Sequence, residues 1–258
     1  MPFADLGELK VHYELSGEGE AVLMFSNSLG TDFSMWEPQQ PELQKQFRIL
    51  RYDTRGHGKS SVTPADYSIE QLGRDVLGLL DALHIDRANF CGLSMGGMIG
   101  IWLGIHAPTR LHRLVLCNTA ARIGSKEMWN ARIATVHKEG MNPVAAAVID
   151  RWFTPGFRAA APDKVATAQR MLENTSPEGY AACCAAIRDM DQRDEVSQIK
   201  VPTLVIYGAS DGVIPHTDAH FLTQQIKGAE EVELAAAHLS NVEQAEAFTQ
   251  AVGNFISK

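Results

Sequence analysis

The chain has 258 residues, of which 45% are hydrophobic and 21% charged, so it is long enough to bury the core of one sizeable α/β domain. Its formal net charge of −8 argues against nucleic-acid binding, which requires clustered lysine and arginine, although one local arginine is enough to attract an anionic substrate. The four cysteines lack the spacing of a disulfide framework, no apolar run approaches the roughly 18 residues of a membrane span, and residues 1–5 do not resemble a signal peptide. We therefore expect a cytoplasmic protein.

The first half of the chain alternates short apolar runs with helical patterns. Residues 8–15 indicate an antiparallel hairpin strand at the edge of a sheet. Residues 68–84 carry apolar side chains at helical spacing, with Ser68 and Gln71 as a capping box, and residues 95–106 predict a second, buried helix. Four apolar runs predict strands: 21–25, 47–52, 88–93 and 111–117.

The pattern changes between residues 121 and 197, where no strand is predicted and Ala, Met, Trp and Arg dominate. We interpret residues 121–197 as an inserted helical cap, or lid. The remaining segments, 1–120 and 198–258, then form one core domain.

The strand-and-helix alternation returns after the insertion, with strands predicted at residues 202–207 and 230–234. A final helix is expected from Ser240 to about residue 256, with Glu243 completing a second capping box. Strands that alternate with helices predict an α/β fold with a mostly parallel central sheet and helices on both faces.

A serine nucleophile is predicted by residues 92–96, Gly-Leu-Ser-Met-Gly, which match G-x-S-x-G. In this motif the serine occupies a sharp turn between a strand and a helix. Residues 208–212 match the same pattern, but they run into Pro215, which prevents an immediate helix. We therefore predict Ser94 as the nucleophile; the alternative is a serine that only caps a helix.

The acid and the base of a catalytic triad are expected at the ends of later strands, because catalytic residues in open α/β sheets lie at the carboxyl ends of strands. Asp211 follows the strand at 202–207, and His238 lies between the last strand and the final helix. We predict that Asp211 orients His238, the general base; a turn residue is the alternative for Asp211. His216 and His220 lack a third ligand, so no metal is expected.

An oxyanion hole needs two backbone donors. One is predicted to be the N–H of Met95, directly after the nucleophile, and the other the N–H of Leu29, in the loop after the first central strand. A plain turn is the alternative for that loop. Residues 55–60 lack the leading glycine of a phosphate-binding loop and are interpreted as a loop near the site.

These motifs together resemble the α/β-hydrolase superfamily; they lie at residues 53–60, 92–97, 208–211 and 238. Within it, residues 26–32, 35–36 and 151–155 are similar to the 3-oxoadipate enol-lactonases. The resemblance implies an α/β-hydrolase fold with a cap and no cofactor. It also implies hydrolysis of 3-oxoadipate enol-lactone, a small anionic lactone, in the β-ketoadipate pathway of aromatic-acid breakdown.

The substrate carboxylate that this resemblance implies needs a donor, and Arg132 and Arg151 are candidates, with solvent-exposed helix charges as the alternative. Trp129 and Trp152 are candidates for the pocket wall, and ordinary cap packing is equally consistent with them. A general carboxylesterase or a cofactor-free perhydrolase or haloperoxidase is the alternative enzyme on the same triad. A small-molecule receptor that keeps a hydrolase pocket is the alternative of another class.

Overall fold

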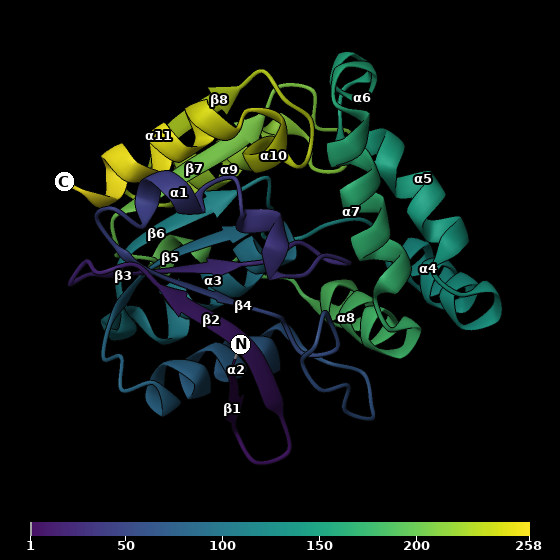
Figure 1. Ribbon diagram of the computed structural model, residues 1–258, viewed down its shortest axis with the longest axis horizontal. Helices are drawn as coiled ribbons and strands as arrows, with labels where there is room; N and C mark the ends of the chain where they lie inside the picture. Colours follow the sequence, from purple (N-terminus) through teal and green to yellow (C-terminus); the bar gives the residue numbers. More distant parts are fainter. Residues whose placement is uncertain (1) are drawn as a thin grey trace.

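The computed structural model describes residues 2–258, which fold around a sheet of eight strands in the order β1-β2-β4-β3-β5-β6-β7-β8 (Figure 1). From β3 and β4 to β8 neighbouring strands pair in parallel, whereas β2 pairs antiparallel with both β1 and β4. The mostly parallel sheet and its edge hairpin are therefore confirmed. The strands are β1 (Phe3–Asp5), β2 (Lys10–Ser16), β3 (Val22–Ser26), β4 (Arg48–Tyr52), β5 (Ala88–Leu93), β6 (Leu111–Cys117), β7 (Thr203–Gly208) and β8 (Glu230–Leu234).

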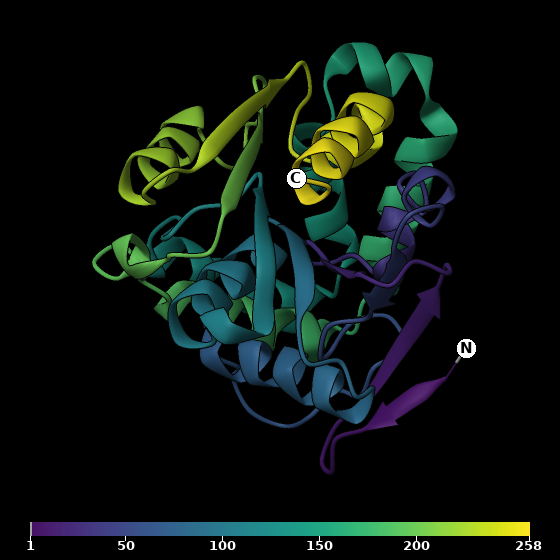
Figure 2. The same cartoon turned by 90° about the vertical axis from the view of Figure 1, so that its left-hand side faces the viewer.

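Helices cover both faces of this sheet, which is why β3, β5 and β7 are buried along their whole length and consist of apolar runs. One face carries α2 (Ile69–Ala82), α3 (Met95–His106) and α9 (His216–Gln225). The other carries α1 (Gln40–Leu43) and α11 (Ala245–Ile256) (Figure 2). No helix within residues 2–258 is long and apolar enough to cross a bilayer.

Five helices lie between β6 and β7, within residues 121–197, and we call this stretch the helical segment. In Figure 1 they form a separate layer beside the carboxyl ends of the strands. The division into core and cap stays a prediction, but the helical content of this stretch agrees with it. The helices are α4 (Lys126–Glu139), α5 (Asn142–Trp152), α6 (Pro155–Ala160), α7 (Pro162–Asn174) and α8 (Pro177–Asp189).

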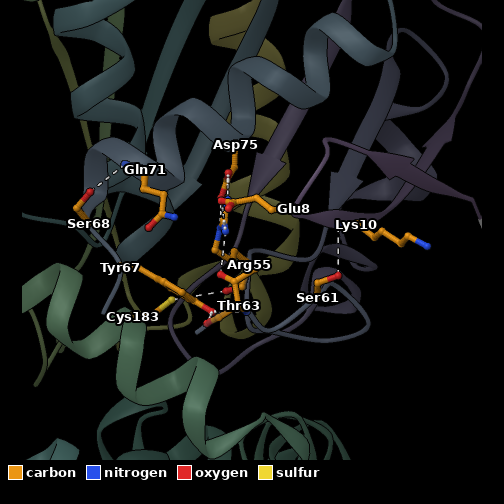
Figure 3. A network of polar contacts seen from close by, with 10 residues as sticks. All are labelled: Glu8, Lys10, Arg55, Ser61, Thr63, Tyr67, Ser68, Gln71, Asp75 and Cys183. Carbon is orange, nitrogen blue, oxygen red and sulfur yellow. Dashed lines mark hydrogen bonds and ion pairs between the residues drawn. The ribbon is translucent and has the colours of Figure 1, made fainter. Parts of the chain in front are cut away.

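The loop after β4 joins the sheet to the helical segment. Arg55 donates to the carboxylate of Asp75 on α2 at 2.6 and 2.8 Å and to Thr63 Oγ1 at 2.8 Å (Figure 3). On its other side, Gly56 packs backbone to backbone against Gly179 of α8, where a Cβ on Gly179 would lie 2.1 Å from the carbonyl oxygen of Gly56. The loop thus determines where α8 sits over the sheet.

The capping boxes have different outcomes. Ser68 Oγ accepts the N–H of Gln71 at 3.1 Å, as expected for the cap of α2 (Figure 3). The predicted capping box of Ser240 and Glu243 is wrong, because Ser240 is the first residue of a short helix, α10 (Ser240–Glu243), and not its cap. The predicted final helix is also interrupted at Gln244, after which α11 begins. Ser240 Oγ donates to Asn118 and Glu243 accepts from Thr154 instead, and these tertiary hydrogen bonds replace the local cap.

Candidate active site

Ser94 stands at the sharp turn between β5 and α3. Its backbone has φ 56° and ψ −114°, a left-handed conformation that residues other than glycine rarely adopt. Neighbouring backbone is so close that a Cβ on Gly92 would lie 2.1 Å from the carbonyl oxygen of Gly96. The N–H of Ser94 donates to the carbonyl of Cys117 on β6 at 2.9 Å. This packing holds the strained turn at the carboxyl edge of the sheet.

Asp211, in the loop after β7, and His238, in the loop before α10, form a buried pair. His238 Nδ1 lies 2.9 Å from Asp211 Oδ2, and Asp211 Oδ1 accepts the N–H groups of Val213 at 2.7 Å and Ile214 at 3.0 Å. Burial by itself raises the pKa of Asp211, but His238 and the hydrogen bonds from Asn118 and Ile214 hold it below the ordinary 3.8. The carboxylate of Asp211 therefore stays ionised and accepts a hydrogen bond from a protonated Nδ1 of His238. The other ring nitrogen of His238, Nε2, is then free to accept a proton.

Asn118 is a further member of this arrangement that carries no motif and is not among the predicted residues. Its Nδ2 donates to Asp211 Oδ2 at 2.9 Å and to the carbonyl of Ala237 at 3.3 Å, and its Oδ1 accepts from Ser240 Oγ at 2.6 Å. It thus joins the acid to the loop that carries His238. The available signal was its place directly after β6, at the edge of the sheet where the other candidates lie.

Ser94 lines a pocket, and the two predicted oxyanion-hole donors are the N–H groups of Leu29 and Met95. Leu29, in the loop after β3, borders that pocket too. The N–H groups on either side of Leu29 have acceptors in the fold, whereas none is found for the Leu29 N–H within residues 2–258. Met95 is the first residue of α3, so its N–H has no partner inside the helix. The arrangement agrees with the predicted oxyanion hole, which stays a prediction.

His57, from the loop after β4, holds the loop that carries Leu29. Its Nε2 accepts the N–H of Gly30 at 2.9 Å, so the ring proton is on Nδ1, which faces the carbonyl of Arg55 at 3.3 Å. Burial lowers the pKa of His57 to about 4, and the ring is therefore neutral near pH 7. On the other side, a Cβ on Gly30 would lie 2.4 Å from Cδ2 of Leu172 on α7. Both the sheet and the helical segment thus position this loop.

Six of the candidate residues border one small cavity between the sheet and the helical segment, which we call the catalytic pocket: Leu29, Ser94, Trp129, Arg132, Trp152 and His238. Ser94 and His238 line it from the sheet, and Trp129, Trp152 and Arg132 line it from the helical segment. The cavity measures about 30 Å³, the space of about one water molecule, so its walls close tightly around it. Its remaining walls are mainly apolar and include Met98, Ile123, Val148, Ile187 and Val213.

The two candidate arginines both line a larger cavity next to the catalytic pocket, but only one of them also borders the pocket. Arg132 borders the catalytic pocket, with its guanidinium 5.3 Å from the centre of the Trp129 ring and Nη1 3.5 Å from the hydroxyl of Tyr180. Arg151 does not border it and lines a larger cavity next to it. Consecutive helix residues point about 100° apart, which is why Arg151 and its neighbour Trp152 face different cavities.

The histidine pair on α9 contributes nothing to this site. The rings of His216 and His220 are 5.5 Å apart, and His220 Nδ1 lies 3.0 Å from Glu231 Oε2. Within residues 2–258, no group of three or more His, Cys, Asp or Glu side chains is arranged to hold a metal ion.

Comparison with known proteins identifies the family. A family model described as alpha/beta hydrolase fold matches residues 21–245. The chain is 44% identical over 246 residues to 3-oxoadipate enol-lactonase 2 of Acinetobacter baylyi, covering 95% of this chain and 92% of that protein.

Two solved structures extend the comparison. The crystal structure of the enol-lactonase from Burkholderia xenovorans LB400 matches with a TM-score of 0.98 and 48% identity, covering 100% of both chains. That of a thermophilic esterase from Thermogutta terrifontis has a TM-score of 0.93 and 28% identity, covering 96% of this chain and 93% of that one. The chain therefore belongs to the α/β-hydrolase fold family and, within it, to the family of the 3-oxoadipate enol-lactonases.

Proposed function

We propose that this enzyme hydrolyses 3-oxoadipate enol-lactone to 3-oxoadipate, with Ser94 as the nucleophile, His238 as the general base and Asp211 as the acid that orients the base. One observation carries the proposal. A serine in a strained strand-to-helix turn borders one pocket with the histidine of a buried His–Asp pair, in a chain that is 44% identical to an enol-lactonase.

Acylation begins when His238 Nε2 takes the hydroxyl proton of Ser94 and the serine oxygen attacks the carbonyl carbon of the lactone. The carbonyl oxygen becomes an oxyanion, which the N–H groups of Leu29 and Met95 stabilise. Collapse of this intermediate breaks the ring C–O bond, and His238 protonates the departing oxygen. The leaving group is an enol, which tautomerises to a ketone and so no longer competes for the acyl-enzyme.

Deacylation repeats the steps with water. The water gives a proton to His238 and attacks the acyl carbon, the ester bond to Ser94 breaks, and the serine oxygen takes the proton back. The new carboxylic acid ionises in solution at neutral pH. The substrate therefore carries one carboxylate and the product carries two.

Arg132 is our candidate for holding the carboxylate of the lactone. It borders the catalytic pocket and forms no ion pair with a carboxylate of residues 2–258, so its guanidinium is available for a bidentate bond. Trp129 and Trp152, both buried, would form the wall against the apolar part of the lactone.

The helical segment acts in this proposal as the cap, because it supplies the arginine and both tryptophans of the pocket. We also place the enzyme in the cytoplasm. All four cysteines are buried free thiols, and Cys91 Sγ lies 3.8 Å from Cys117 Sγ without a bond, which is in keeping with a reducing compartment.

The decisive experiment compares Ser94→Ala with Ser210→Ala, because these serines belong to the two matches of the same motif and Ser210 is exposed. We expect kcat/KM for the enol-lactone to fall by at least about 10³-fold in Ser94→Ala and to stay unchanged in Ser210→Ala. Mass spectrometry after a fluorophosphonate probe should find the label on Ser94. An unlabelled Ser94 would favour a receptor.

The substrate is tested separately by comparing the enol-lactone with a neutral aryl acetate on the wild-type enzyme. A large kcat/KM preference for the lactone is expected. Equal or better turnover of the aryl ester would overturn the lactonase assignment in favour of a general carboxylesterase.

A further inference from the structure

A second cavity, which we call the arginine chamber, lies beside the catalytic pocket. It measures about 620 Å³, and Ile123, Trp129, Arg132 and Val213 line both cavities. The two spaces are therefore adjacent. The catalytic pocket, at about 30 Å³, has room for about one water molecule, so the chamber beside it is the larger space for a six-carbon acid.

The chamber is strongly cationic, in contrast to the chain as a whole with its net charge of −8. Four arginines line it, at positions 122, 132, 151 and 193, against a single carboxyl group, that of Asp218. Burial raises the pKa of Asp218 above the ordinary 3.8. An anion in the chamber therefore meets an excess of positive charge.

The arginines differ in whether the protein neutralises them. Arg122 and Arg193 share the carboxylate of Asp191, at 3.8 Å and 2.7 Å. Arg132 and Arg151 form no ion pair with a carboxylate of residues 2–258, and the pKa of Arg151 is lowered by burial and by the nearby charge of Arg132. Two partly buried guanidinium groups thus face one cavity without a counter-ion from the protein, so both are available to pair with an anion that binds between them.

We propose that the arginine chamber is a binding site for short dicarboxylates, with Arg132 and Arg151 each pairing with one carboxylate. This assignment rests on the proposed function: the natural occupant of the chamber is the reaction product, which has gained a second carboxylate at the carbon that Ser94 attacked. The site takes a dianion more tightly than a monoanion because each guanidinium then has a partner. The chamber thereby receives the product as it leaves the catalytic pocket.

The test measures binding by isothermal titration calorimetry in the Ser94→Ala protein, which removes turnover from the measurement. The probes are adipate, a six-carbon dianion, and hexanoate, a monoanion of the same length. We expect adipate to bind about tenfold more tightly than hexanoate, and the additional change Arg151→Gln to weaken adipate about tenfold while it alters hexanoate much less. Arg170→Gln, an exposed arginine of α7, is the matched control and should leave both affinities unchanged.

Equal binding of the two acids, or an adipate affinity that survives Arg151→Gln, would overturn the proposal. Arg151→Lys keeps the charge without the planar fork and should restore part of the affinity, which separates a charge effect from a folding defect. The result is independent of the lactonase assay. Adipate binding without lactone turnover would keep the chamber and reject the proposed reaction, and the reverse outcome would do the opposite.

Discussion

Acid should destabilise this protein in part through His57, which lies outside the proposed triad. Burial lowers the pKa of His57 from the ordinary 6.5 to about 4, and its Nε2 accepts the N–H of Gly30. The unfolded chain therefore takes up a proton below pH 6.5 that the folded protein refuses. The stability that depends on the neutral ring is fully present above about pH 6.5, falls with pH, and is lost once the pH has passed through about 4.

The size of this effect follows from the difference between the two pKa values, 6.5 and about 4. The complete loss amounts to about 3 kcal/mol, of which about 2 kcal/mol falls between pH 7.5 and pH 5. This is a substantial part of the roughly 5–15 kcal/mol that stabilises a typical domain. His57→Gln keeps an acceptor for the N–H of Gly30 but does not titrate, so it should abolish this part of the pH dependence.

The assay is urea unfolding at pH 7.5 and pH 5 of the wild type, His57→Gln and His137→Gln, the last being an exposed histidine of α4. Between these pH values the wild type and the His137→Gln control should each lose about 2 kcal/mol more than His57→Gln. Equal losses in all three proteins would refute the reasoning. So would an NMR titration of the wild type in which the His57 ring protonates near pH 6.5.

Three further predictions concern the contacts around the site. Asn118→Ala should lower kcat about 10- to 100-fold and raise the acid-limb pKa of the pH profile of kcat, because Asp211 and the loop of Ala237 lose a shared donor. An unshifted profile would contradict a positioning role for Asn118. Glu243→Ala should lower the free energy of unfolding by about 1–3 kcal/mol, since the Glu243 carboxylate accepts the N–H of Ala237 and the hydroxyl of Thr154. In the same denaturation series, the change Glu246→Ala at an exposed position should alter the free energy of unfolding by less than about 0.5 kcal/mol. Gly179→Ala should destabilise the protein by about 1–3 kcal/mol because the new Cβ meets the Gly56 carbonyl. Gly156→Ala, with open space around it in α6, should be neutral or stabilising. Equal melting temperatures of these two variants would refute the close contact between Gly179 and Gly56.

Much of the fold could be predicted because local patterns report on the backbone. Runs rich in apolar residues predicted β3, β5, β6 and β7 to within one residue, since a strand covered on both faces is mostly apolar. The prediction of a helix at residues 95–106 was confirmed by α3. The motif glycines at 92 and 96 could be interpreted from the sequence because the tightly packed turn before α3 leaves no room for a Cβ at either position. Asp211 and His238 were predicted because catalytic residues of open α/β sheets lie at the carboxyl ends of strands. In the structure His238 Nδ1 lies 2.9 Å from Asp211 Oδ2.

Other features could not be derived locally because they depend on which distant segments meet. Ser240 and Glu243 have the spacing of a capping box, yet they bond to Asn118 and Thr154, whose positions only the packed loops determine. The hydrogen bond of His57 to Gly30 likewise crosses between two strand-end loops.

The chain order of strands, helices and strand-end residues was thus determined by the sequence itself, because hydrophobic periodicity and turn chemistry act over a few residues. Only the tertiary structure decided which side chains share a cavity. Arg132 and Arg151 looked equivalent as helix arginines, but the docking of α4 and α5 over the sheet sends the first into the catalytic pocket and the second only into the arginine chamber. That choice depends on helix rotation and packing, which no local pattern encodes.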